Sequence, residues 1–167
     1  MRRLLGVAGA LLGVGLATGC TVDDHDAPQP PKEMSRDRTR AMIGEVAADV
    51  VREQFGALPA PQREVELRCD SARWFDVDRA YVMQSVWDLP LAPEDHERTL
   101  RALDTGSGRI GSGRVDSDFM ALGDGRFTAH GYDPENSIGY TMTSNEPPTS
   151  VRLWVNSSCL LDPGDGG

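Results

Sequence analysis

The sequence predicts an α+β domain, a two-layer sandwich in which an antiparallel sheet of about five to six strands carries two helices on one face. Three observations predict this fold. Apolar residues recur at helical spacing in one long segment, and a second helix is indicated by the signals at its two ends. The rest of the chain holds short β-branched and aromatic segments separated by glycine and proline. The predicted order over residues 35–161 is α-β-β-α-β-β-β-β.

The first helix is expected from Ser35 to Phe55. Its apolar stripe consists of Ile43, Val46, Ala47, Val50 and Val51. Gly56 suits a C-cap, and the prolines at 59 and 61 cannot continue a helix.

Two strands are expected next. In residues 64–70, Val65, Leu67 and Cys69 alternate with charged residues, so these three side chains are expected to share the inward face. Residues 80–87 are rich in β-branched and aromatic side chains and form the second strand. Residues 71–79, which include Trp74 and Phe75, are expected to connect the two as a hairpin loop.

The second helix is expected to open at Pro93, a favoured first position. Acidic residues come first and arginines later: Glu94, Asp95 and Glu97, then Arg98 and Arg101. This order matches the helix dipole, and Gly106 follows the end. Leu100 and Leu103 are expected to form the buried edge.

The chain beyond Val115 is expected to be β-rich. Residues 119–122 and 126–130 flank Gly123-Asp124-Gly125, which is typical of a tight hairpin. Residues 138–142 and 151–155 supply the last two strands, and residues 162–167 should be a disordered tail. The predicted core comprises Ile43, Val46, Val50, Val65, Leu67, Leu100, Leu103, Leu153 and Val155.

The first nineteen residues have the order of a secretory signal. Arg2 and Arg3 precede an apolar stretch, Leu4 to Ala17, which spans about 21 Å as a helix and is too short for a hydrocarbon core of about 30 Å. Residues 16–20, Leu-Ala-Thr-Gly-Cys, resemble the lipobox of bacterial lipoproteins. The resemblance implies that Cys20 receives a diacylglycerol, that residues 1–19 are removed, and that the protein is anchored on the extracytoplasmic face of the cell membrane.

Residues 20–34 are expected to be the lipidated cysteine and a disordered, acidic, proline-rich tether. Without Arg2 and Arg3, 15 basic side chains face 26 acidic ones, so nucleic acid is an unsuitable partner. Lipidation of Cys20 leaves Cys69 and Cys159 as a pair in an oxidising compartment. Each of the two cysteines continues the alternation of the apolar residues that precede it in its strand. The sequence therefore predicts a disulfide between them, with both sulfur atoms pointing toward the core.

The sequence supports no catalytic residues, metal ligands or cofactor. Gly106 to Gly111 matches G-x-G-x-x-G, but it follows a helix and opens a strand, the wrong context for a dinucleotide. His25, His96 and His130 lack metal-ligand spacing. Acidic pairs, Asp76 with Asp78 and Asp116 with Asp118, leave open a small envelope hydrolase that uses paired carboxylates.

Trp154 is the residue most suggestive of binding. Its parity is opposite to that of Leu153 and Val155, which places it on the sheet face away from the helices, where Tyr140 or Phe127 could join it. The mature domain resembles the small, functionally uncharacterised lipoproteins of actinobacteria, with a lipobox, a proline-rich tether and a cysteine after a serine-rich last strand. We therefore expect a non-enzymatic binding or accessory module whose partner is an envelope protein or a cell-wall component.

Overall fold

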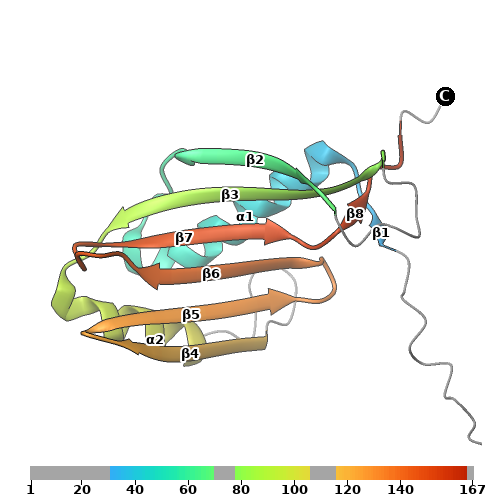
Figure 1. The fold of residues 1–167 in the computed structure, drawn as a ribbon. Coiled ribbons are helices and arrows are strands. Elements are labelled where there is room, and N and C mark those ends of the chain that lie inside the picture. Colours follow the sequence, from blue (N-terminus) through green and yellow to red (C-terminus); the bar gives the residue numbers. More distant parts are fainter. Residues whose placement is uncertain (1–30, 70–77, 106–115, 165–167) are drawn as a thin grey trace, which may run out of the picture.

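The computed structural model describes residues 31–69, 78–105 and 116–164. Its helical elements are α1 (Arg36–Phe55), a 3-10 turn η3 (Pro93–Asp95) and α2 (His96–Thr105). The strands are β1 (Lys32–Glu33), β2 (Arg63–Arg68), β3 (Ala80–Pro90), β4 (Asp116–Gly123), β5 (Arg126–Asp133), β6 (Ile138–Ser144), β7 (Ser150–Ser157) and β8 (Leu160–Leu161). Figure 1 shows these elements in order.

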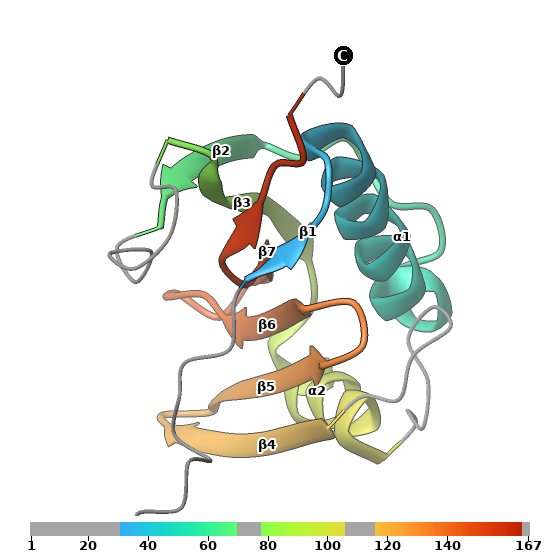
Figure 2. The ribbon, with the colours of Figure 1, turned by 90° about the vertical axis from the view of Figure 1, so that its right-hand side faces the viewer.

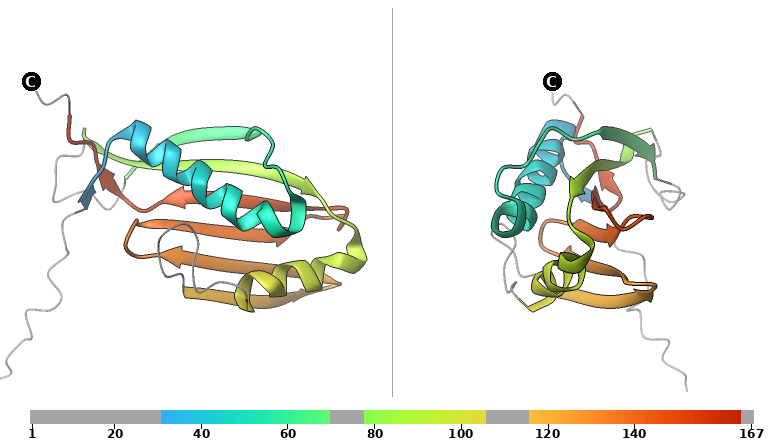
Figure 3. Two further views of the ribbon diagram at one scale, coloured as in Figure 1. Left: turned by 180° about the vertical axis from the view of Figure 1, so that it is seen from behind. Right: turned by 90° about the vertical axis from the view of Figure 1, so that its left-hand side faces the viewer.

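All eight strands belong to one sheet. Its order is β1-β8-β3-β7-β6-β5-β4, and β2 pairs with the other edge of β3. Every pair is antiparallel except β1 with β8. Figure 2 shows that the sheet curls and that both helices lie on one side of it. Seen from behind in Figure 3, α1 crosses the strands near β3 and β7, and α2 lies along β4 and β5.

The α+β class is confirmed, but the expected two-layer sandwich of five to six strands is wrong in its strand number and shape. The sheet has eight strands and is curled because neighbouring strands twist. Two of the strands, β1 and β8, hold only two residues each, too few to show any alternation in the sequence. The sequence therefore predicts residues 32–33 as part of the tether and residues 160–161 as the end of the domain.

The domain begins earlier than expected. Lys32 and Glu33 pair with β8, and Met34 is buried in the core beneath them. The hydroxyl group of Tyr81 donates to the Met34 carbonyl oxygen at 2.7 Å, which holds this segment to β3. At the other end, the backbone N–H of Asp162 donates to the Arg79 carbonyl oxygen at 2.9 Å, so the packed chain extends to Asp162. Residues 1–30, which include the predicted signal segment 1–19, and residues 165–167 lie outside the described residues.

Helix α1 forms as the sequence predicts. The Ser35 side chain caps it by accepting a hydrogen bond from the Arg38 N–H at 3.3 Å, and Gly56 ends it at φ +75°. Its buried face packs on the sheet. Pro93 opens the second helical segment through a single 3-10 turn before α2 starts at His96.

Strand β2 has the opposite orientation to the one expected. Glu66 pairs with Met83 and Leu67 with Val82 across β3, and the odd-numbered residues of β3 are the ones that face the helices. Glu66 therefore lies on the helix side. Its carboxylate oxygens accept from the Arg36 Nε–H, at 3.0 and 3.1 Å. Leu67 lies on the other face and is 49% exposed.

The core lies between the helices and the sheet. Of the nine residues predicted for it, seven are buried: Ile43, Val46, Val50, Leu100, Leu103, Leu153 and Val155. Val65 is half-buried and Leu67 exposed because both side chains point to the face of the sheet away from the helices. Within residues 31–69, 78–105 and 116–164, no helix is both long and apolar enough to span a membrane.

Candidate binding face

None of the described helices lies over one face of the sheet, which we call the open face (Figures 2 and 3). Cross-strand partners in an antiparallel sheet point to the same side, so the pairings define its members. They are Arg63, Val65, Leu67, Val82, Gln84, Val86, Asp88, Asp118, Met120, Thr128, His130, Tyr132, Thr141, Thr143, Arg152, Trp154 and Asn156, with Gly139 between Tyr132 and Asn156. Most of these side chains are half-buried by their neighbours, whereas the opposite face forms the core.

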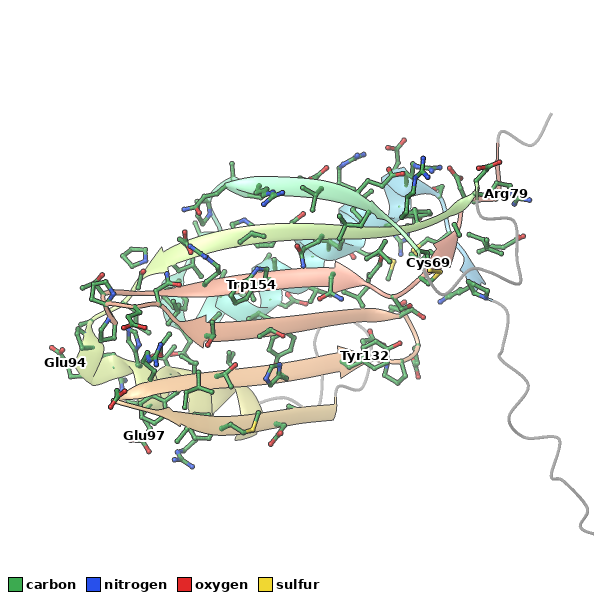
Figure 4. All side chains as sticks on the ribbon, in the orientation of Figure 1. Cys69, Arg79, Glu94, Glu97, Tyr132 and Trp154 are labelled. Atoms are coloured by element: carbon green, nitrogen blue, oxygen red, sulfur yellow. A yellow bond between two sulfur atoms is a disulfide. The ribbon has the colours of Figure 1, made fainter. Side chains whose placement is uncertain are left out.

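Trp154 lies in the middle of the open face, half-buried (Figure 4). It pairs with Val86 of β3 on one side and with Thr141 of β6 on the other. The Arg152 guanidinium carbon is 5.7 Å from the centre of the indole ring, within cation–π range. The predicted placement of this tryptophan away from the helices is thus confirmed.

Tyr140 and Phe127 do not join Trp154. Tyr140 is buried in the core on the helix side, opposite Val155. Phe127 stacks on Phe119 with ring centroids 5.7 Å apart. Arg101 of α2 lies 4.3 Å above the Phe119 ring, so this pair also faces the helices. The aromatic residue that does share the open face is Tyr132, which is 42% exposed.

The arginine beside Trp154 is neutralised by an aspartate. Arg152 and Asp88 are cross-strand partners, and the guanidinium donates from Nε at 2.6 Å and from Nη2 at 2.9 Å to the two carboxylate oxygens. The hydrogen bonds from Arg152 lower the pKa of Asp88 below its ordinary value, and Asn145 adds to the effect. This part of the face therefore carries no net charge.

His130 lies next to Thr141 and Thr128. Its Nδ1 is 3.0 Å from the Thr141 hydroxyl oxygen, and its Nε2 is 3.4 Å from the Thr128 hydroxyl oxygen. The single hydroxyl hydrogen of Thr128 is donated to the Met142 carbonyl oxygen at 3.3 Å. In the Nε2–H tautomer, Thr128 accepts from His130 and Nδ1 accepts the hydrogen of Thr141; in the Nδ1–H tautomer, Thr141 accepts instead. The oxygen of Thr141 keeps its acceptor capacity.

A shallow depression of about 340 Å³ lies beside this histidine on the open face. Five of its lining residues have polar side chains on the open face: Asp118, His130, Tyr132, Thr141 and Asn156. Its floor is left low by Gly139, which has no side chain between Tyr132 and Asn156. Trp154 is the cross-strand partner of Thr141, which lines the depression.

The sequence pattern did not predict that the residues of this depression lie together. The usable signal was the alternation along 138–144 and 150–157, where apolar residues enter the core and the residues between them point the other way. Which of these polar residues gather at one place depends on register. Asn156 meets Gly139, and Gly139 meets Tyr132, only because β6 lies between β5 and β7.

The acidic pairs do not form a described catalytic centre. Asp118 is the one carboxylate among the described residues around the depression. The Asp116 side chain and Asp76 lie outside the described parts of the molecule, and Asp78 is exposed. No group of three or more histidine, cysteine or acidic residues within the described ranges is arranged to hold a metal ion.

His96 has a structural environment. It is fully buried, its Nε2 lies 3.2 Å from the Leu91 carbonyl oxygen, and its Nδ1 lies 2.8 Å from the Ser144 hydroxyl. The Ser144 oxygen also accepts from the Phe127 N–H at 3.0 Å. His96 therefore fastens the start of α2 to β6. His25 lies outside the described residues.

The predicted disulfide between Cys69 and Cys159 is present, with the two Cα atoms 5.7 Å apart. Its predicted direction is wrong, because both cysteines are half-buried and neither belongs to the core. Val65 and Leu67 share the parity of Cys69 but lie on the open face. Between β7 and β8 the pairing with β3 shifts by one residue, so Leu160, and not Leu161, continues the buried face.

Cys20 and the glycine-rich segment 106–115 lie outside the described residues, so the structure does not bear on the lipid anchor or on that loop. Comparison with known proteins adds no assignment: no family model, curated protein or solved structure matches this chain.

Proposed function

We propose that this protein is a lipid-anchored, extracytoplasmic binding module that engages an envelope component through the open face. The observation that carries the proposal is a sheet face with no described helix over it, in which Trp154 and Tyr132 stand among polar side chains. Aromatic side chains beside hydrogen-bonding groups are enriched where proteins contact partners. The buried residues on the other face leave this one free of any role in the described core.

The anchor and the binding face support each other. Between Cys20 and Lys32 the tether reaches at most about 40 Å, so a lipidated chain would keep the domain close to the membrane. Confinement raises the local concentration of the domain near envelope partners, which allows a modest affinity to suffice.

The lipid anchor is tested by the intact mass of the protein extracted from membranes in detergent. The expected mass is that of a chain starting at Cys20 with added acyl chains. A Cys20→Ala variant should retain the signal segment or appear unacylated. A wild-type mature N-terminus without acyl mass would contradict the anchor.

The binding face is tested by site-specific photo-crosslinking in intact cells. A benzoylphenylalanine at Thr143 or Gln84, on the open face near Trp154, should give discrete crosslinked products. The matched control is the same probe at Glu45, an exposed position of α1. Trp154→Ala should weaken the products without changing the unfolding midpoint by much. Equal crosslinking from Glu45, or products unaffected by Trp154→Ala, would refute the open face as the binding surface.

The hydrolase alternative receives no support from a described pair of carboxylates. Arg152 lowers the pKa of Asp88. A general acid needs a raised pKa.

A further inference from the structure

We infer that the depression around Gly139 binds a neutral, polyhydroxylated ligand, one sugar unit of a glycan. The inference rests on the proposed function, because it names the ligand class for one part of the open face. The depression is bordered by Asp118, His130, Tyr132, Thr141 and Asn156.

The charge of the described border is unfavourable for a polyanion. Among the described residues that line the depression there is one carboxylate and one imidazole, and neither arginine nor lysine. Arg152, on the same face, is held by Asp88 through both carboxylate oxygens. An acidic glycan or a phosphate group would therefore meet Asp118 with no compensating cation among the described lining residues.

The hydrogen-bonding groups are mostly acceptors. In the Nε2–H tautomer of His130 the hydrogen of Thr141 is donated to Nδ1, and in either tautomer the oxygen of Thr141 presents acceptor capacity to the depression. Asn156 uses its Nδ2 toward the Ser157 carbonyl oxygen at 3.3 Å, which leaves its Oδ1 as an acceptor. The side chain of Asp118 makes no hydrogen bond or ion pair to any other described residue. Neighbouring hydroxyl groups of a sugar supply several donors within such a short distance, which suits three acceptors on adjacent strands.

The aromatic groups supply the apolar contact that a sugar ring also needs. The Tyr132 ring passes beside Gly139, where a built Cβ would lie 3.4 Å from Tyr132 Cδ2. Its 42% exposure leaves ring surface available at the rim of the depression. Trp154 is the cross-strand partner of Thr141 on the neighbouring strand β7. A longer glycan would therefore extend from Tyr132 toward Trp154. A stacked aromatic surface contacts the C–H face of a sugar while the acceptors bind its hydroxyl groups.

Gly139 provides the test, since its side chain would fill the depression. A Cβ at this position would make only ordinary contacts, at 3.4 Å to Tyr132 and 3.5 Å to the Gly131 carbonyl oxygen. Gly139→Val therefore has room for its Cβ and places two methyl groups on the floor of the depression. The matched control is Leu67→Ala, an exposed position on the same face but three strands away.

The experiment is an NMR titration of the full chain, with its disulfide intact and in detergent, using tetrasaccharides of equal length and different charge. The neutral probe is the N-acetylglucosamine tetramer, with mannotetraose as a second neutral probe. The charged probes are the glucosamine tetramer and tetragalacturonate. We expect a neutral probe to bind at least tenfold more tightly than tetragalacturonate and to shift the resonances of Tyr132, Gly139 and Asn156.

Gly139→Val should weaken neutral-probe binding at least tenfold, and Leu67→Ala should leave it within twofold. A urea midpoint within error of the wild type establishes that Gly139→Val is folded; Asn156→Ala serves as the second variant if it is not. Absence of shifts with both neutral probes, or binding of only the cationic tetramer, would overturn the inference. Crosslinking near Trp154 that persists in Gly139→Val, without any neutral-glycan binding, would leave the proposed function intact and reject this ligand class alone.

Discussion

At the scale of single residues, two glycines in adjacent strands serve opposite faces of the sheet. Gly131 of β5 pairs with Tyr140, whose ring lies over it on the core side. Gly139 of β6 pairs with Tyr132 and leaves the floor of the depression low on the open face. Neither glycine has a positive φ, so each is suited to its position by the space above it and not by the backbone.

The first prediction compares these glycines. In Gly131→Ala the new Cβ would lie 2.2 Å from Tyr140 Cε1, so the ring must move within a packed core. We expect a loss of about 1–3 kcal/mol in the free energy of unfolding. Gly139→Ala is the control and should cost less than about 1 kcal/mol. Urea denaturation measures both, and equal midpoints would show that Tyr140 does not lie over Gly131.

At the scale of elements, β2 shows that alternation identifies two faces without telling which one is inward. The strand lies at the edge of the sheet, and the contacts given between its helix side and α1 are made by long side chains of that helix. Glu66 and Glu64 point to that side and bind Arg36 and Arg40 of α1, with an N–O distance of 2.6 Å for Glu64 and Arg40. Exposed pairs of this kind fix orientation more than they stabilise the domain.

The second prediction tests this orientation. Leu67→Ser should change the free energy of unfolding by no more than about 0.5 kcal/mol because Leu67 is 49% exposed. Leu153→Ala, in the core of β7, should cost about 2–5 kcal/mol. Chemical denaturation of the two variants side by side gives the comparison. A loss at Leu67 comparable to the loss at Leu153 would mean that β2 faces the core after all.

A third prediction concerns the pair that joins β3 to β7. Because Arg152 lowers the pKa of Asp88, the carboxylate stabilises the folded state at pH above its ordinary pKa of 3.8, and this contribution is lost as the pH falls below that value. Asp88→Asn should therefore lower stability by about 0.5–1 kcal/mol at neutral pH. The difference from the wild type should shrink as the pH is lowered through 4 toward 2. Thermal unfolding at several pH values measures it, and a difference independent of pH would contradict the assignment.

At the scale of the whole molecule, the disulfide and the two smallest strands close the domain at one end. Cys69 follows β2 and Cys159 precedes β8, so the bond ties an edge strand to the end of the chain, near where β1 enters (Figures 1 and 4). Ion pairing of Arg36 with Asp162 joins the same region to α1. The open face and its depression are thus carried by a sheet that is fastened at the end where β1 enters it.

The fourth prediction is that removing this bond destabilises the whole domain. The bond closes a loop with a sequence separation of 90, for which the loss of unfolded-state entropy corresponds to about 4–5 kcal/mol as an upper figure. The double variant Cys69→Ser with Cys159→Ser should lower the free energy of unfolding by up to that amount. Calorimetry against the oxidised wild type measures the effect. A double variant as stable as the wild type would show that the closure contributes nothing.

Local signals of the sequence determined much of this molecule: α1 with its Ser35 cap and Gly56 end, the hairpin at Gly123–Gly125, the pairing of the two cysteines and the outward direction of Trp154. These features depend on neighbouring residues, on parity or on the small number of cysteines. Only the tertiary structure decided the inversion of β2, the strands β1 and β8, and the gathering of Tyr132, Gly139 and Asn156. The physical reason is that burial and register are set by partners distant in the sequence, which no local pattern specifies.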